Sequence, residues 1–251
     1  MRQTNYDEIA ATYDRRDIEE DYGGIERALT DFIEATQYAV LDVGCGTGHW
    51  LRVLQHHVRS IGIDLSRQML LQAHTNVPST TVVRARAESL PFVDGSFERV
   101  FTINAHHHFA DKRSFLGEAR RVLRSGGSLM TIALDPHIGS DQWWIYDYFE
   151  GTLDIDKQRY PPCEQIRAWM REVGFTDTYT REVQHLPGNV PAGEALESGM
   201  ISRSHTSQLA VLTREEYDAG MERIRAALRK DSTLRLSADL RVYATYGKNL
   251  T

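Results

Sequence analysis

The stretch that decides the fold is Val40-Leu41-Asp42-Val43-Gly44-Cys45-Gly46-Thr47-Gly48-His49-Trp50. It begins with an apolar run of the kind that forms a strand buried on both faces. Three glycines follow at alternate positions, where the backbone can turn sharply and approach a ligand that a Cβ would keep away. A helix is expected next, and its first N–H groups lack partners within the helix, so they favour a carboxylate or phosphate. We therefore predict a cradle for a nucleotide-like ligand.

The spacing of the glycines distinguishes two classes of ligand. A dinucleotide such as NAD requires G-x-G-x-x-G, and His49 occupies the position of the third glycine in that pattern. An NAD-dependent dehydrogenase is therefore disfavoured. The remaining pattern, D-x-G-x-G-x-G, resembles the first motif of the class I S-adenosylmethionine-dependent methyltransferases. The resemblance implies that this loop binds S-adenosylmethionine through Asp42, Gly44, Cys45, Gly46 and Gly48.

Asp64 ends the next predicted strand, which begins at Ile61. An acid about 20 residues beyond a glycine-rich turn, at the end of the neighbouring strand, can accept hydrogen bonds from both ribose hydroxyls. The alternative is that Asp64 caps the helix that follows, although Ser66 can do so itself. Leu65 and Met69 are expected beside the adenine ring, and both are equally suited to the core.

A further landmark begins at Arg84 and reads R-A-R-A-E-S-L-P-F-V-D-G-S-F-E. It resembles the family motif D-A-E-x-L-P-F-x-D-x-S-F-D, with two departures. Arg86 replaces the Asp that receives the adenine amino group in the family, and Glu98 replaces the final Asp. Because arginine cannot accept a hydrogen bond, we expect the backbone of Ala87 or the carboxylate of Glu88 to recognise adenine, with Arg86 stacked on the ring.

Asn104 and three consecutive histidines follow the fourth predicted strand, Val100 to Ile103. The resemblance implies that Asn104 lies near the cofactor and that His107 or His108, preferably His107, faces the cleft. We expect no metal site, because adjacent strand residues point to opposite faces and metal ligands are normally spaced further apart.

His107 is the candidate catalytic base for an acceptor that must lose a proton, since an imidazole titrates near neutral pH. The alternative is that it is a polar anchor for the following helix. Reserve candidates for the base are Tyr13, His106 and His137, and Tyr13 is also expected to contact the cofactor.

Composition limits the partners. The chain has 251 residues and a formal net charge of -6, which argues against a nucleic-acid-binding surface because phosphate neutralisation needs clustered Lys and Arg. Its two cysteines fit no metal pattern and indicate a reducing compartment. No apolar run has the ~20 residues of a membrane span, and residues 1–11 do not resemble a signal peptide. We expect a cytoplasmic monomer or homodimer that contacts neither membrane nor nucleic acid.

The resemblance implies an α/β, Rossmann-like, doubly wound sheet of seven strands, mostly parallel with the last strand antiparallel. We assign residues 1–36 to an N-terminal helical lid and residues 37–135 to the S-adenosylmethionine-binding core. Residues 136–160, rich in aromatic side chains, and residues 186–236, begun by a loop at Leu186-Pro187-Gly188, are predicted to be substrate-cover insertions. Residues 161–185 and 237–251 complete the sheet.

The predicted function is methyl transfer from S-adenosylmethionine to a small organic acceptor, on O, N or C, by in-line displacement. The alternative is a noncatalytic or repurposed S-adenosylmethionine-binding protein. In that protein the altered Arg86 position and the aromatic cover would serve ligand sensing or a different reaction. Accumulation of the demethylated cofactor distinguishes the two.

Overall fold

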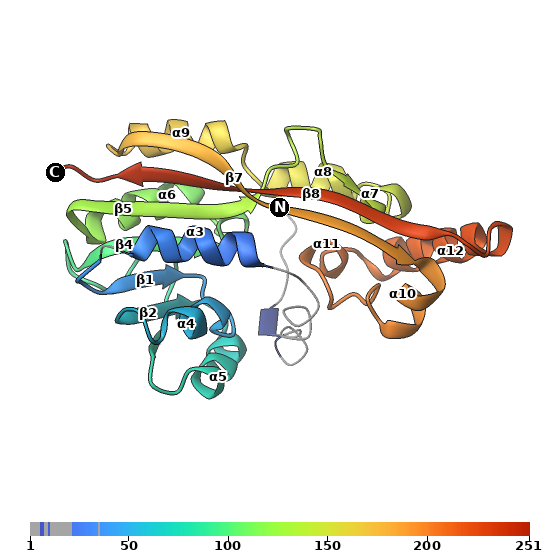
Figure 1. Ribbon diagram of the computed structural model, residues 1–251, viewed down its shortest axis with the longest axis horizontal. Helices are drawn as coiled ribbons and strands as arrows, with labels where there is room; N and C mark the ends of the chain where they lie inside the picture. The colour runs from blue at the N-terminus through green and yellow to red at the C-terminus, as the bar shows by residue number, and fades with distance from the viewer. Residues whose placement is uncertain (1–5, 8–9, 11–21, 35) are drawn as a thin grey trace.

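The computed structural model describes residues 6–7, 10, 22–34 and 36–251. These residues form a mixed β-sheet covered by helices on both faces, with a long arm that continues the sheet to one side (Figure 1). None of the described helices is long and apolar enough to cross a bilayer. Tyr13 and most of the predicted N-terminal lid lie outside the described residues.

The sheet contains eight strands among the described residues, in the order β3-β2-β1-β4-β5-β8-β6, with β7 paired to β8. The first five strands pair in parallel and β8 is antiparallel to β5, which confirms the predicted α/β Rossmann-like class. The two-residue strand β6 was not predicted. The carboxyl ends of β1, β2 and β4 therefore meet at one edge, where ligands bind in such sheets. The strands are β1 (Val40–Val43), β2 (Ser60–Asp64), β3 (Thr81–Arg84), β4 (Phe97–Ile103), β5 (Leu123–Leu134), β6 (Gln142–Trp143), β7 (Thr176–Pro191) and β8 (Arg235–Lys248).

Short polar side chains fix the starts of several helices. Ser66 Oγ accepts the N–H of Met69, and Thr213 forms a reciprocal capping box with Glu216. The described helices are α3 (Gly23–Ile33), α4 (His49–Leu54), α5 (Arg67–Asn76), the 3-10 turn η1 (His106–His108), α6 (Lys112–Val122), α7 (Trp144–Tyr148), α8 (Thr152–Arg159), α9 (Cys163–Glu172), α10 (Ala192–Ser198), α11 (Ser207–Ala210) and α12 (Arg214–Lys230).

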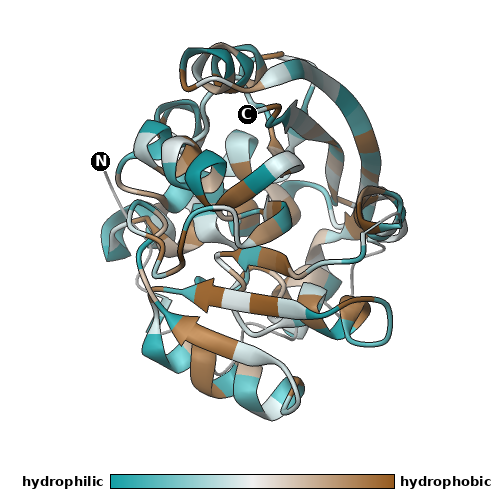
Figure 2. Cartoon of the chain, turned by 90° about the vertical axis from the view of Figure 1, so that its left-hand side faces the viewer, coloured by the Kyte–Doolittle hydropathy of each residue, from teal (hydrophilic) through white to brown (hydrophobic). Residues whose placement is uncertain are grey.

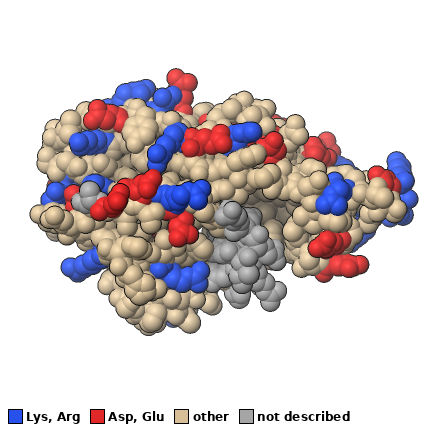
Figure 3. Space-filling model, in the orientation of Figure 1, with Lys and Arg blue, Asp and Glu red and all other residues tan. Residues whose placement is uncertain are grey.

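Two apolar clusters cover the opposite faces of the sheet. On one face α6 and α9 pack over β1 and β4, and on the other α3 and α4 pack over β1, β4, β5 and β8. Alternate residues of a strand serve the two clusters, as Val40 and Leu41 show. Figure 2 shows the result, with apolar strands in the middle and polar residues on the outward helix faces. Acidic and basic side chains are interspersed on the surface seen in Figure 3.

Strands β7 and β8 form a ribbon that runs well beyond the sheet and carries α10, α11 and α12 (Figure 1). The loop predicted at Leu186-Pro187-Gly188 is wrong, since β7 continues to Pro191 and pairs as far as Arg235. Proline is tolerated because β7 is an edge strand paired only with β8, so a missing N–H interrupts no second ladder. The helices on this ribbon share an apolar cluster with α7, and we call α7, α8 and α10–α12 the cap.

Candidate active site

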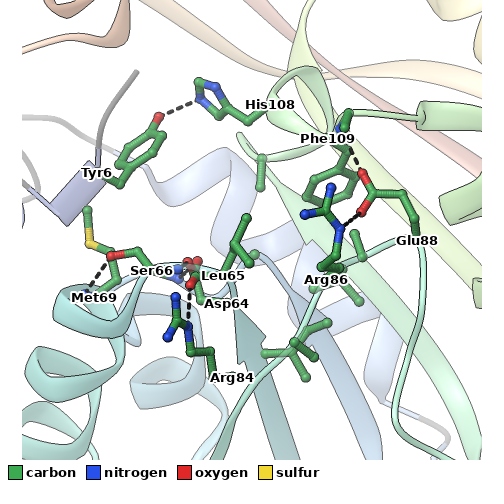
Figure 4. Close-up of a pocket in the computed structure, with 18 of the residues that line it drawn as sticks. Tyr6, Asp64, Leu65, Ser66, Met69, Arg84, Arg86, Glu88, His108 and Phe109 are labelled. Carbon is green, nitrogen blue, oxygen red and sulfur yellow. Dashed lines mark hydrogen bonds and ion pairs between the residues drawn. The ribbon is translucent and has the colours of Figure 1, made fainter. Parts of the chain in front are cut away.

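Two cavities meet at the carboxyl ends of β1, β2 and β4. The first, of about 360 Å³, lies between the glycine loop and the segment 84–88. The second, of about 90 Å³, lies between α3, the end of β5, and the cap. Tyr6, Asn104 and His108 line both cavities, so these residues mark the junction. Figure 4 shows most of the residues that line the first cavity.

The glycine loop shapes one wall of the first cavity through its backbone. Gly44 has a φ of 81°, and a Cβ there would come within 2.4 Å of the Ala105 Cβ. Gly46 has a φ of 53° with open space around it, so no side chain covers the backbone at this point of the loop. Gly48 precedes α4, and the Cys45 side chain packs against Leu51 in the core, so neither residue lines either cavity.

Asp64 is held at the floor of the first cavity by two backbone hydrogen bonds. Its Oδ2 accepts the N–H of Gly46 at 3.0 Å, and its Oδ1 accepts the N–H of Ser66 at 2.8 Å. Burial raises the pKa of this carboxyl, and the hydrogen bonds oppose that shift. Ser66 itself caps α5, so the capping alternative for Asp64 is unnecessary. Each carboxylate oxygen retains acceptor capacity for a ligand hydroxyl.

Asp42 lies on β1 behind the loop and is only 1% exposed. Its Oδ2 has no hydrogen-bond partner within the described part of the chain. Burial raises its pKa well above the ordinary value, and the nearby Asp64 adds to the shift. The buried Asp42 beside the half-buried Asp64 favours a ligand that carries positive charge.

On the side of the cavity predicted to hold adenine, Arg86 and Glu88 bind protein groups in place of the predicted contacts with the ring. Arg86 is exposed and forms an ion pair with Glu88 at 3.6 Å, and Glu88 Oε1 accepts the N–H groups of Ala110 and Asp111. Glu88 is thereby tied to the segment after η1. Arg84, which the sequence did not single out, donates from Nε to the Leu65 carbonyl at 2.9 Å.

Three of the predicted contact residues differ in exposure. Leu65 is 53% exposed at the cavity rim, Met69 is 1% exposed beneath it, and Ala87 is buried on the opposite side. An exposed apolar side chain at a rim is suited to covering one face of a ring.

The three histidines lie in the 3-10 turn η1 and not on a strand, so the strand argument about their directions is wrong. Asn104, which follows β4, has a φ of 53° in the left-handed region, and the chain turns there into η1. His106 points into the core and donates from Nε2 to the Lys112 carbonyl at 3.3 Å, and burial lowers its pKa to about 4. No group of three metal-ligating side chains is found among residues 6–7, 10, 22–34 and 36–251.

His107 and His108 face the cavities. His107 lines only the second cavity, where its ring stacks on Tyr160 at a centroid distance of 3.8 Å. Within the described residues neither of its ring nitrogens has a hydrogen-bond partner, and burial together with nearby cationic groups lowers its pKa well below the ordinary value. His108 contacts the Tyr6 hydroxyl through Nε2 (Figure 4).

A family model described as a methyltransferase domain matches residues 41–131. An uncharacterised protein of Methanocaldococcus jannaschii is 31% identical over 200 residues, which cover 70% of this chain and 76% of that protein. A phthiotriol/phenolphthiotriol dimycocerosates methyltransferase of Mycobacterium ulcerans is 37% identical over 116 residues, 44% of this chain and 43% of that protein.

Solved structures agree on the fold. A putative methyltransferase from an antibiotic biosynthesis pathway of Anabaena variabilis has a TM-score of 0.66 at 21% identity, with 88% of this chain and 96% of that chain covered. The chain belongs to the class I S-adenosylmethionine-dependent methyltransferases. It spans about half the length of the first curated relatives that it matches, 38% to 56% of each.

The cofactor of this methyltransferase is S-adenosylmethionine, and the first cavity fits it. The cradle at Gly44 and Gly46 admits a ligand against bare backbone. The half-buried Asp64 on the cavity wall and the buried Asp42 behind it suit a molecule with an ammonium, a sulfonium and ribose hydroxyls.

The second cavity of the methyltransferase is apolar on one side and polar on the other. Ile25, Leu186 and Val242 are among its apolar side chains. The aromatic side chain of Trp143, which directly precedes α7, also lines this cavity. Trp144 and Phe149, which were predicted to cover the substrate, are instead buried in the cap's own apolar cluster. His137, a reserve base, bonds the Tyr160 carbonyl at 2.9 Å and lines neither cavity.

The polar side of the second cavity was missed from the sequence. It is formed by Thr206, Ser207 and Gln208, at the start of α11, with Tyr160 beside them. Gln208 donates to the Asp156 carboxylate at 2.9 Å and to the Tyr160 hydroxyl at 3.2 Å. The only local signal was Thr206, which caps α11 through the N–H of Leu209.

Proposed function

We propose that this methyltransferase transfers the methyl group of S-adenosylmethionine to a small organic acceptor held in the second cavity. One observation carries the proposal. The two cavities share Tyr6, Asn104 and His108 at the end of β4, so an acceptor in one is adjacent to a cofactor in the other. The bound cofactor supplies a methyl group on a good leaving group. The chain's main contribution is then to hold the acceptor in line, which can lower the barrier by about 7 kcal/mol or more.

The residues of the first cavity are assigned roles by their positions. Asp64 accepts from the ribose hydroxyls, and the bare backbone of Gly44 and Gly46 lies against the amino-acid end, with Asp42 behind the loop. Leu65 and Met69 lie against the adenine, and the Ala87 backbone recognises its edge. Because Glu88 is engaged by Ala110 and Asp111, Arg86 and Glu88 act mainly by closing the adenine side.

His107 is assigned as the group that receives a proton from an acceptor hydroxyl or amine. It remains neutral at physiological pH because burial lowers its pKa, and a neutral imidazole offers one lone pair. Its stacking on Tyr160 fixes the plane of the ring. A carbon acceptor with carbanion character needs no such base, and for it His107 would only shape the cavity.

The N-terminal segment is assigned as a lid, from the contacts of its described residues. Tyr6 contacts His108 at the cavity junction, and Asp7 accepts hydrogen bonds from Ser66 Oγ at 2.5 Å and from the N–H of Gln68 at 3.3 Å. The contacts of Tyr6 and Asp7 thus join residues that are about 60 to 100 positions apart in the sequence and line the first cavity. Such a lid excludes water from the reacting groups.

The test is turnover by the purified chain. It is incubated with S-adenosylmethionine and a panel of phenols, catechols, amines, carboxylic acids and enolisable ketones, and S-adenosylhomocysteine is measured by mass spectrometry. The Asp64→Ala variant is the matched control. Product above this control with at least one acceptor supports methyl transfer. Tight S-adenosylmethionine binding without any turnover over the panel would instead favour the noncatalytic alternative.

A further inference from the structure

A buried charged network lies behind the two histidines. Arg159 and Asp156, both on α8, are each 1% exposed, and Arg159 Nη1 lies 3.4 Å from Asp156 Oδ1. The same Nη1 donates to the Ser207 carbonyl at 3.3 Å. The other carboxylate oxygen of Asp156 accepts from Tyr146 at 3.0 Å and from Gln208 at 2.9 Å. The pair is therefore held from three sides within the cap.

The second guanidinium nitrogen reaches out of this network to the active site. Arg159 Nη2 lies 3.5 Å from Nδ1 of His108, whose Nε2 contacts the Tyr6 hydroxyl. An arginine has only donors and keeps its charge in proteins. Nδ1 of His108 must therefore be the acceptor in this contact and carry no proton. A neutral ring in that state has its proton on Nε2.

We infer that Arg159 is a positioning residue that holds His108 in the Nε2–H tautomer, so that His108 is a hydrogen-bond donor at the junction of the two cavities. Arg159 itself lines neither cavity and acts only through His108. The positioning role rests on the proposed function, whereas the tautomer does not. His108 then differs in kind from its neighbour His107, whose ring has a lone pair to offer.

The rings of His107 and His108 are in contact, so the effect of Arg159 on His108 extends to His107. The centroid of the His107 ring lies 3.8 Å from the centroid of the His108 ring and 3.8 Å from that of the Tyr160 ring. A rotation of His108 about its side-chain bonds would therefore disturb the ring assigned to receive the proton. With its proton on Nε2, His108 donates to the Tyr6 hydroxyl at the junction of the two cavities.

The tautomer is tested directly by long-range 1H–15N correlation spectra of the full chain labelled with 15N-histidine. The His108 signals among the ten histidines are identified by their loss in His108→Gln. We expect Nδ1 to have the shift of an unprotonated nitrogen and Nε2 that of a protonated one at neutral pH. A proton on Nδ1, or on both nitrogens, would overturn the inference whether or not turnover is found.

The positioning role is tested with the double variant Arg159→Met/Asp156→Asn, which removes both buried charges together and so avoids an unpaired one. We expect the His108 tautomer to become mixed and turnover to fall about tenfold or more, with an unchanged Kd for S-adenosylmethionine. The control Arg113→Met/Glu172→Gln removes an exposed ion pair on α6 and α9 and should change neither. A double variant that keeps full turnover, or that keeps the Nε2–H tautomer, would refute the role of Arg159.

Discussion

The cofactor half of the molecule and the cap hold their polar groups in opposite ways. In the cofactor half, backbone geometry does the positioning: Gly44 and Gly46 open the loop, and Asp64 is fixed by N–H groups of its own neighbourhood. In the cap, side chains position other side chains, as Asp156 does with Arg159 and Gln208. A backbone-built site tolerates change outside its few residues. A side-chain network loses several contacts when one member is removed.

The largest expected effect follows from that property of the cap. Arg159→Met leaves the Asp156 carboxylate buried without its cation, so the free energy of unfolding should fall by about 3–5 kcal/mol. Chemical denaturation measures this change. Adding Asp156→Asn should restore most of the loss, and Arg113→Met, at an exposed ion pair, should cost less than about 1 kcal/mol. Equal losses for Arg159→Met and Arg113→Met would show that the cap network is not special.

In the cofactor half, Asp64→Ala should weaken S-adenosylmethionine binding by about 100-fold, because two hydrogen bonds to a charged group are lost. Calorimetric titration gives the Kd. Thermal unfolding of the unliganded variant should be close to that of the wild type, since the relieved burial of a carboxylate offsets the lost contacts to Gly46 and Ser66. Glu197→Ala, exposed on α10, is the control. Unchanged affinity would remove Asp64 from the site.

Where the two halves meet, His107→Phe should lower kcat by about tenfold or more while the Kd for S-adenosylmethionine stays within about twofold. Phenylalanine retains the stacking on Tyr160 and lacks the nitrogen lone pair. Steady-state kinetics with a hydroxyl acceptor measure the change, and His74→Phe, at an exposed histidine of α5, is the control. A variant with full turnover would leave catalysis without this base.

The smallest effect is a pH dependence that belongs to the cofactor half. Burial raises the folded-state pKa of Asp42 well above that of an unfolded carboxyl, so the folded chain binds more protons between the two values. The stability of the cofactor-free chain therefore falls as pH rises through this window. Asp42→Asn removes the effect, so its melting temperature relative to wild type should rise from about pH 4 to about pH 8.

Melting curves across that range, with Asp154→Asn at an exposed site of α8 as control, measure the difference. A difference in melting temperature that does not change with pH would mean that Asp42 is not the group responsible for the pH dependence of stability.

The contrast between the halves also explains what could be predicted from the sequence. Asp64 and the glycine loop lie within 25 residues of one another on consecutive elements, so a local pattern was sufficient to place them on one cavity. The parallel order of strands follows from the same alternation of strand and helix. The direction of the histidines could not be predicted, because it depends on the left-handed φ of Asn104, which no periodicity signals.

The contacts within the cap could not be predicted from the sequence, because they join segments that are distant along the chain. Arg159 and Ser207 are 48 residues apart, and neither stands in a motif. The aromatic residues of α7 were predicted to face substrate, yet Trp144 and Phe149 fill the cap's own core. Nothing local distinguishes an aromatic residue that lines a cavity from one that packs, since both have the same helical spacing. Glu88 shows the same limit inside the cofactor half, because its partners Ala110 and Asp111 follow an intervening strand and turn.

Strand β8 belongs to both halves at once. Its carboxyl-terminal part, Val242 to Lys248, is sandwiched between β5 and β7, while its first residues carry the ribbon to the cap. The cap is therefore not a separate folding unit attached by a hinge. The ribbon that carries α10, α11 and α12 shares its hydrogen-bond ladder with the sheet, so we expect the two halves to unfold together and any shift of the cap over an acceptor to be taken up as twist along the ribbon.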